Sequence, residues 1–239
     1  MQNLETLIVA LAFSAVYTSA GRFHLVQTKF PRRWLSVAAG VSVAYVFMDI
    51  LPELEARRRG FVTAIGGDVL FAEQRIYIAA LLGFVFFYGL DHFALPSQPH
   101  GEEAASGARF WLHIGGYALY SWLIGYLLVD RVAMGGLSLG LYGSAMVLHL
   151  AVVGHGLVEK HGWAYDRLGA WVLAASILAG WLMSVTVRMP EIMMARLFGF
   201  VGGGVVMTSM NEELPGERGG RFWWFLAGSM GCAILLLLA

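Results

Sequence analysis

Apolar residues in this chain fall in long uninterrupted runs rather than in narrow stripes along amphipathic segments. A run of about 20 apolar residues crosses the hydrocarbon core of a bilayer. Strands of a membrane barrel would alternate apolar and polar residues, so helices are the element that fits these runs. Charged residues make up only 13% of the chain, against roughly 25% in a soluble domain. The pattern predicts an all-α, polytopic membrane protein whose surroundings are the lipid bilayer.

The runs predict eight transmembrane helices in a single transmembrane domain that covers residues 1–239. The expected spans are 4–21, 35–52, 76–94, 110–129, 135–157, 168–187, 192–210 and 222–239. The connections between them are short, and no separate soluble domain fits. The net charge is zero, so we expect no nucleic-acid partner.

The basic residues near the N-terminus follow the first apolar run instead of preceding it. A secretory signal peptide has its basic region first, so we expect this run to stay in the protein as a transmembrane helix. Lys and Arg slightly favour the loops after the odd-numbered spans, which indicates that the N- and C-termini lie outside. We therefore expect an integral protein of the bacterial inner membrane.

One short pattern occurs in both the second and the seventh span. A glycine opens it, an acid follows nine residues later, and Leu-Pro comes at positions eleven and twelve. The two copies are Gly40, Asp49 and Leu51-Pro52, then Gly203, Glu212 and Leu214-Pro215. Inverted structural repeats are common in transporters. We interpret the two copies as a 3+2+3 inverted repeat, with Asp49 and Glu212 at opposite mouths of one pathway.

The fifth span carries the polar side chains that best fit metal or proton chemistry. His149 lies within its apolar stretch, and intramembrane polar residues are functional by default. His155 and Glu159 are four residues apart and share a helix face, so together they could hold a metal or a proton. His113 in the fourth span is a further candidate, because imidazole suits zinc and similar ions. The alternative for each is structural: a hydrogen-bonded packing histidine, or a carboxylate at the membrane interface.

In their order along the chain, these segments resemble the ZIP (Zrt/Irt-like) family of metal transporters. The resemblance covers nearly the whole chain. The second span, G-V-S-V-A-Y-V-F-M-D-I-L-P-E, is similar to the family's glycine-to-Leu-Pro-Glu segment. The third span, L-L-G-F-V-F-F-Y-G-L-D, and the last two, G-G-G-V-V…E-E-L-P and F-L-A-G-S-M-G, are similar to their counterparts. The resemblance implies an eight-span bundle that transports Zn²⁺ or another divalent metal and holds no permanent cofactor.

Most of the family's metal-binding residues have no counterpart in this chain. The family carries a His-Asn-x-x-acid pattern in span 4 and a His-Glu-x-Pro-acid pattern in span 5. Here span 4 reads G-G-Y-A-L-Y-S-W-L-I-G and span 5 reads H-L-A-V-V-G-H, so only His149 matches. The resemblance therefore supports the fold and not the usual two-metal site.

Three hypotheses for the function follow from these residues. The leading one is a divergent transporter of a divalent metal or another small cation by alternating access, with His149 as the central ligand. The second is a membrane sensor or scaffold subunit of the same fold, which the missing carboxylates favour. The third is a membrane redox protein with haem bound by histidine pairs. We expect no enzyme, because no nucleophile–base motif or phosphate loop is present, and we expect a homodimer among the partners.

Overall fold

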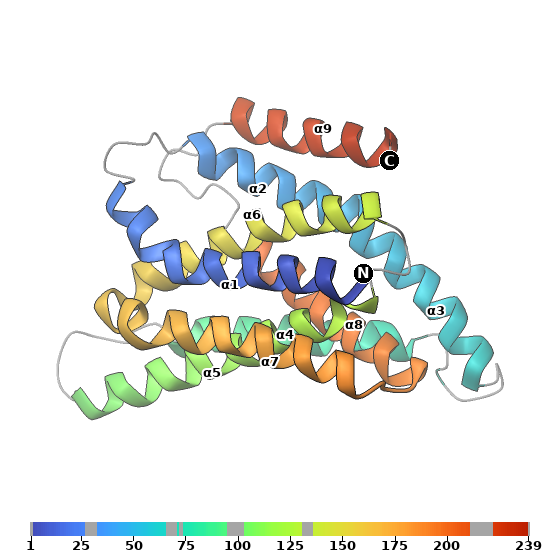
Figure 1. Cartoon of the computed structure of the whole chain (residues 1–239), viewed down its shortest axis with the longest axis horizontal. Coiled ribbons are helices and arrows are strands. Elements are labelled where there is room, and N and C mark those ends of the chain that lie inside the picture. The colour runs from blue at the N-terminus through green and yellow to red at the C-terminus, as the bar shows by residue number, and fades with distance from the viewer. Residues whose placement is uncertain are drawn as a thin grey trace.

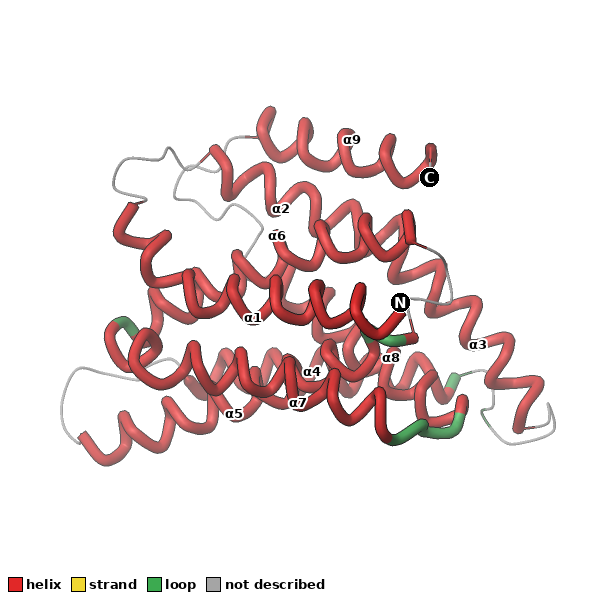
Figure 2. Tube along the Cα trace, in the orientation of Figure 1, coloured by secondary structure: helices red, strands yellow, loops and turns green. Residues whose placement is uncertain are grey.

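The protein is helical throughout the part of the chain that its structure, a computed structural model, describes. The described residues are 2–26, 33–65, 71, 74–94, 103–130, 136–210 and 222–238. Helix accounts for 95% of them, and they contain no strand; in Figure 2 almost all of the described chain is helix. The predicted all-α architecture is therefore confirmed.

The predicted spans all correspond to helices. In chain order the helices are α1 (Gln2–Val26), α2 (Arg33–Tyr45), α3 (Leu51–Ile65), α4 (Arg75–Ala94), α5 (Glu103–Leu127), α6 (Gly136–His161), α7 (Ala170–Thr186), α8 (Glu191–Thr208) and α9 (Phe222–Leu238). Six spans in the described part are long and apolar enough to cross a membrane, and α9 is a shorter apolar helix of 17 residues. These helices indicate a membrane protein. The helices lie side by side, and both termini lie at the same end of the bundle (Figure 1).

The second span does not end at Leu51-Pro52, as the sequence predicts, but continues to Ile65. A π-helical turn over Val46–Ile50 joins α2 to α3, so that one helical segment runs from Arg33 to Ile65. Proline has no N–H to donate and its ring crowds the preceding turn. The wider π turn directly before Pro52 relieves this crowding, so the proline is accommodated inside the helix.

Three helix pairs meet through reciprocal glycine contacts: α2 with α9, α4 with α8, and α5 with α7. In the last pair, a Cβ added at Gly125 would overlap the carbonyl oxygen of Ile177, and one added at Gly180 would overlap that of Trp122. Small residues at such crossings let two backbones approach closely, which is how helices associate where no water is expelled. These crossings fix the pairs that surround the centre of the bundle.

Candidate functional site

His149 lies buried within α6, in the interior of the bundle. Its Nε2 atom is 2.9 Å from the hydroxyl of Tyr120 on α5 and 3.5 Å from the hydroxyl of Thr208 on α8. Tyr120 is in turn fixed by the ring of Phe87, 4.9 Å away between centroids. Three helices thus meet at one histidine, which confirms that His149 is an interior residue.

The hydrogen bonds around His149 define what its ring can do. The Thr208 hydroxyl donates to the carbonyl oxygens of its own helix, Gly204 at 2.9 Å and Val205 at 3.1 Å. In the neutral tautomer with a bare Nε2, the Tyr120 hydroxyl therefore donates to that nitrogen. A metal ion that binds Nε2 has to displace the Tyr120 proton donor first.

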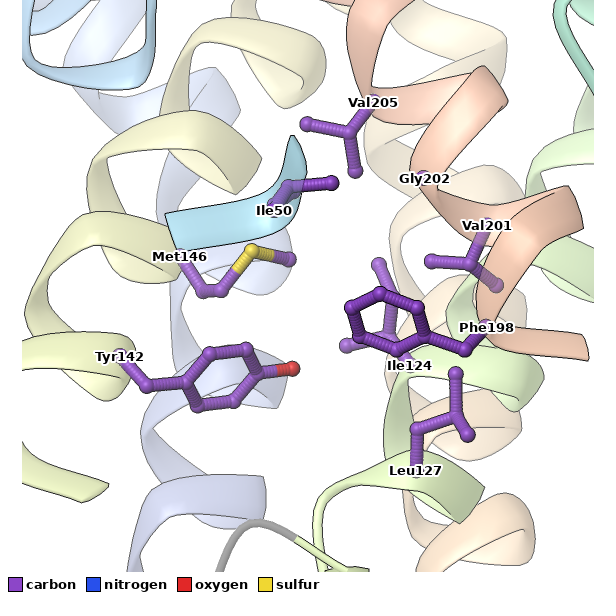
Figure 3. A pocket seen from close by; sticks show the side chains of 9 residues that line it. All are labelled: Ile50, Ile124, Leu127, Tyr142, Met146, Phe198, Val201, Gly202 and Val205. Carbon is purple, nitrogen blue, oxygen red and sulfur yellow. The ribbon is translucent and has the colours of Figure 1, made fainter. Parts of the chain in front are cut away.

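A small apolar cavity lies in the same bundle, between the π turn, α5, α6 and α8 (Figure 3). Its volume is about 20 Å³, which is close to the space that one water molecule needs. Its lining residues are Ile50, Ile124, Leu127, Tyr142, Met146, Phe198, Val201, Gly202 and Val205. Apart from the Tyr142 hydroxyl the walls are apolar. A hydrated cation does not fit here, so the bundle is closed at this level.

A second polar cluster joins α4, α5 and α6 at the end where α6 terminates. The carboxylate of Asp91 accepts hydrogen bonds from His113 Nε2 and from Lys160 Nζ, each at 3.0 Å. His113 Nδ1 shares a hydrogen bond with His161 Nε2 at 2.7 Å. His113 and Asp91 are buried, and Lys160 and His161 are partly exposed. Both His113 nitrogens are engaged, so this ring has no free lone pair for a metal.

Asp91→Asn is expected to lower the free energy of unfolding by about 2–3 kcal/mol. The change removes the carboxylate that balances Lys160, and the partial exposure of Lys160 keeps the loss below that of a fully buried pair. Denaturant unfolding of the purified protein in detergent measures it. Adding Lys160→Met should recover part of the loss. Glu55→Gln, which breaks a more exposed pair with Arg58, should change stability far less, because solvent screens the charge of Glu55.

The other predicted ligands are spread along the chain. His155 and Glu159 do share a face of α6, with 3.4 Å between His155 Nε2 and a Glu159 carboxylate oxygen, as their spacing predicts. Asp49 lies in the π turn inside the long second segment and is partly exposed, so it is not at a helix end. Glu212 lies outside the described residues. Within the described ranges, no three His, Cys, Asp or Glu side chains gather where they could hold one metal ion.

At the opposite end of the bundle, Arg57 of α3 joins three helices. Its guanidinium contacts Glu53 at 2.7 Å and also bonds the carboxylate of Asp130, which follows α5. It lies 4.5 Å from the centroid of the Phe198 ring on α8. Phe198 also lines the small apolar cavity, so Arg57 packs against a residue of the cavity wall. Nothing in the sequence around Arg57 points to this role, because neither the extension of the helix to Ile65 nor the distant partner Asp130 follows from the pattern.

Sequence comparisons with protein families and with characterised proteins find no match for this chain. The function therefore has to be argued from the geometry of the bundle.

Proposed function

We propose that this protein is a membrane carrier for a small cation, a divalent metal such as Zn²⁺ in the first place, which works by alternating access. The observation that carries the proposal is the position of His149, a buried imidazole shared by three helices in the interior of a membrane bundle. A polar side chain at such depth is costly and marks ion or proton pathways. In this proposal His149 is the central ligand, and Tyr120 occupies its Nε2 atom until the cation arrives.

The closed α3 end of the bundle is what a carrier has in one of its two states. At the α3 end, the Arg57 ion pairs link helices, and the small apolar cavity has no room for a hydrated cation. Carriers expose a central site to one side at a time, commonly by moving one group of helices against another. His155 and Glu159, further along α6, would then contact the cation on its way to the other side.

The glycine crossings support an inverted repeat with eight spans. Gly40, which opens the first sequence copy, packs on the Phe225 carbonyl of α9, and Gly203, which opens the second, packs on the Ala80 carbonyl of α4. Each contact is returned by a partner glycine: Gly228 meets Val37 and Gly83 meets Phe200. In each of these contacts, the glycine packs on the carbonyl oxygen of the partner helix. That carbonyl belongs to the residue three positions before the partner's own glycine. The proposed ZIP-like 3+2+3 plan relates these two crossings by symmetry.

Uptake into proteoliposomes tests the proposal. Zinc, cadmium, manganese and iron(II) are offered to the wild type and to His149→Ala, and saturable uptake of at least one metal should be lost in the variant. Tyr120→Phe should increase the apparent affinity by about 2–10-fold, because the hydrogen bond that the cation has to break at Nε2 is removed. His92→Ala, at an exposed histidine of α4, is the matched control and should leave uptake unchanged. Unchanged uptake in His149→Ala would contradict the proposal.

A second candidate is a non-transporting sensor or scaffold subunit with the same bundle. It is favoured by the lack of a three-ligand group among the described residues. In that case none of the four metals is taken up by folded protein, and His149→Ala changes stability only. A stoichiometric partner protein should then copurify with the chain.

A further inference from the structure

A groove of about 300 Å³ runs between α2, α6 and α9. Its walls include Val37 and Val41 of α2, Leu141 and Leu148 of α6, and Gly231 of α9. Leu235 of α9 also lines the groove and is more than half exposed, as are Ile234 and Leu238 beside it. We propose that this groove binds one hydrocarbon chain of a membrane lipid.

The groove is wide enough for a single hydrocarbon chain and too narrow for a helix. The lining extends from Val37 to Tyr45 along α2 and from Ala227 to Leu236 along α9, which is about 12–13 Å at 1.5 Å per residue. Even the whole empty space of the groove, about 710 Å³ with its open mouth included, gives a cross-section of about 57 Å² over this length. A helix with its side chains is about 10–12 Å wide, or roughly 80–110 Å². A helix of a second copy is too wide to enter, whereas an extended hydrocarbon chain is not.

The volume also limits the length of the bound chain. An apolar cavity of about 150 Å³ holds one benzene molecule. On that scale the groove has room for roughly a dozen carbon atoms. Left empty, its lining would lose dispersion contacts on one side, so an acyl chain from the bilayer is the natural occupant.

The lining recognises a lipid tail and not a headgroup. No charged side chain belongs to the described residues that line the groove. The Ser144 hydroxyl donates to the Gly140 carbonyl of its own helix, so its proton is not offered to a ligand. Between α4 and α5, by contrast, Leu90 fills the space beside Gly116. On α9, a Cβ added at Gly231 would meet nothing within 4 Å.

Photolabelling in vesicles tests the proposal independently of transport. The full chain is reconstituted in phosphatidylcholine that carries a diazirine in one acyl chain, irradiated, and digested for mass spectrometry. Label should concentrate in residues 141–148 and 227–236. Gly231→Leu places a side chain in the groove and should reduce this label about fivefold or more. Gly140→Leu is the control, because Gly140 is exposed, does not line the groove and has open space around it.

Ser144→Leu fills the groove from the opposite wall and replaces Gly231→Leu if that variant does not fold. Loss of the label in either filled variant, with Gly140→Leu unchanged, supports a bound acyl chain. Label spread evenly over the outward faces of α1, α4 and α9 means ordinary lipid contact and overturns the proposal. Crosslinks between two copies of the chain at α9 also overturn it, since a second copy then covers the groove.

Discussion

Replacing Gly125 by alanine is expected to destabilise the bundle, while the same change at Gly115 on the same helix is expected to stabilise it. Alanine is the better helix former by about 1 kcal/mol, so propensity favours both changes. At Gly125, however, the new Cβ overlaps the carbonyl oxygen of Ile177, which belongs to a backbone that cannot move aside easily. Overpacking of this kind costs about 1–3 kcal/mol. The two variants should therefore shift stability in opposite directions.

Unfolding of the purified protein in detergent, followed by circular dichroism, measures both shifts. Gly115 is a matched control because it is exposed and a Cβ there would meet nothing within 4 Å. Gly180→Ala, which affects the reciprocal contact with Trp122, should destabilise as Gly125→Ala does. If Gly125→Ala were as stabilising as Gly115→Ala, close approach at this crossing would not hold α5 and α7 together.

The positions of the helices could be predicted because long apolar runs leave the backbone only one way to satisfy its hydrogen bonds. The end of the second span could not be predicted in this way. Pro52 is ordinarily a stop signal, and a π turn that absorbs it depends on local backbone geometry that no composition rule contains. Glycines inside apolar helices permit close contacts, but they do not tell which helix meets which. Only the structure shows which helices pair: Gly125 of α5 faces Ile177 of α7, and Gly180 of α7 faces Trp122 of α5.

The candidate site could be predicted where residues share one helix and not where several helices meet. His155 and Glu159 lie together as helical spacing requires. His113 binds Asp91 and His161 instead of joining His149 in one ligand set, because the rotation of each helix about its axis decides which residues face one another. Asp91 could have been found, since a carboxylate inside an apolar span needs a partner. Lys160, at the end of α6, is that partner.

Arg57→Gln is expected to open the α3 end of the bundle to water-soluble reagents. Arg57 is mostly buried and links α3 to Asp130 after α5 and to Phe198 on α8. Because these contacts cross between helices, their loss favours an open state in which the apolar cavity below is reached from outside. A hydrogen bond to a charged group contributes about 1.5–3 kcal/mol. Partial exposure of Asp130 lowers this, so an increase of about tenfold in the open population is expected.

A cysteine in the cavity reports the opening. Val201→Cys is introduced together with Cys232→Ser, which removes the natural thiol, and a charged, membrane-impermeant thiol reagent is added. Its reaction rate should rise about tenfold with Arg57→Gln.

The matched control is Arg58→Gln, because Arg58 has comparable exposure and pairs at 2.7 Å with Glu55 of its own helix, and this variant keeps the hydrogen bond from Tyr77 of α4 to Glu55. Arg58→Gln should leave the rate unchanged, and Asp130→Asn should raise it as Arg57→Gln does. If Arg58→Gln accelerated the reaction equally, local unwinding of α3 would be the cause. If neither Arg57→Gln nor Asp130→Asn accelerated it, these ion pairs would not be what closes the bundle. The reagent measures access to the cavity and not transport. Its result therefore tests the closure of this end independently of the role of His149 in uptake.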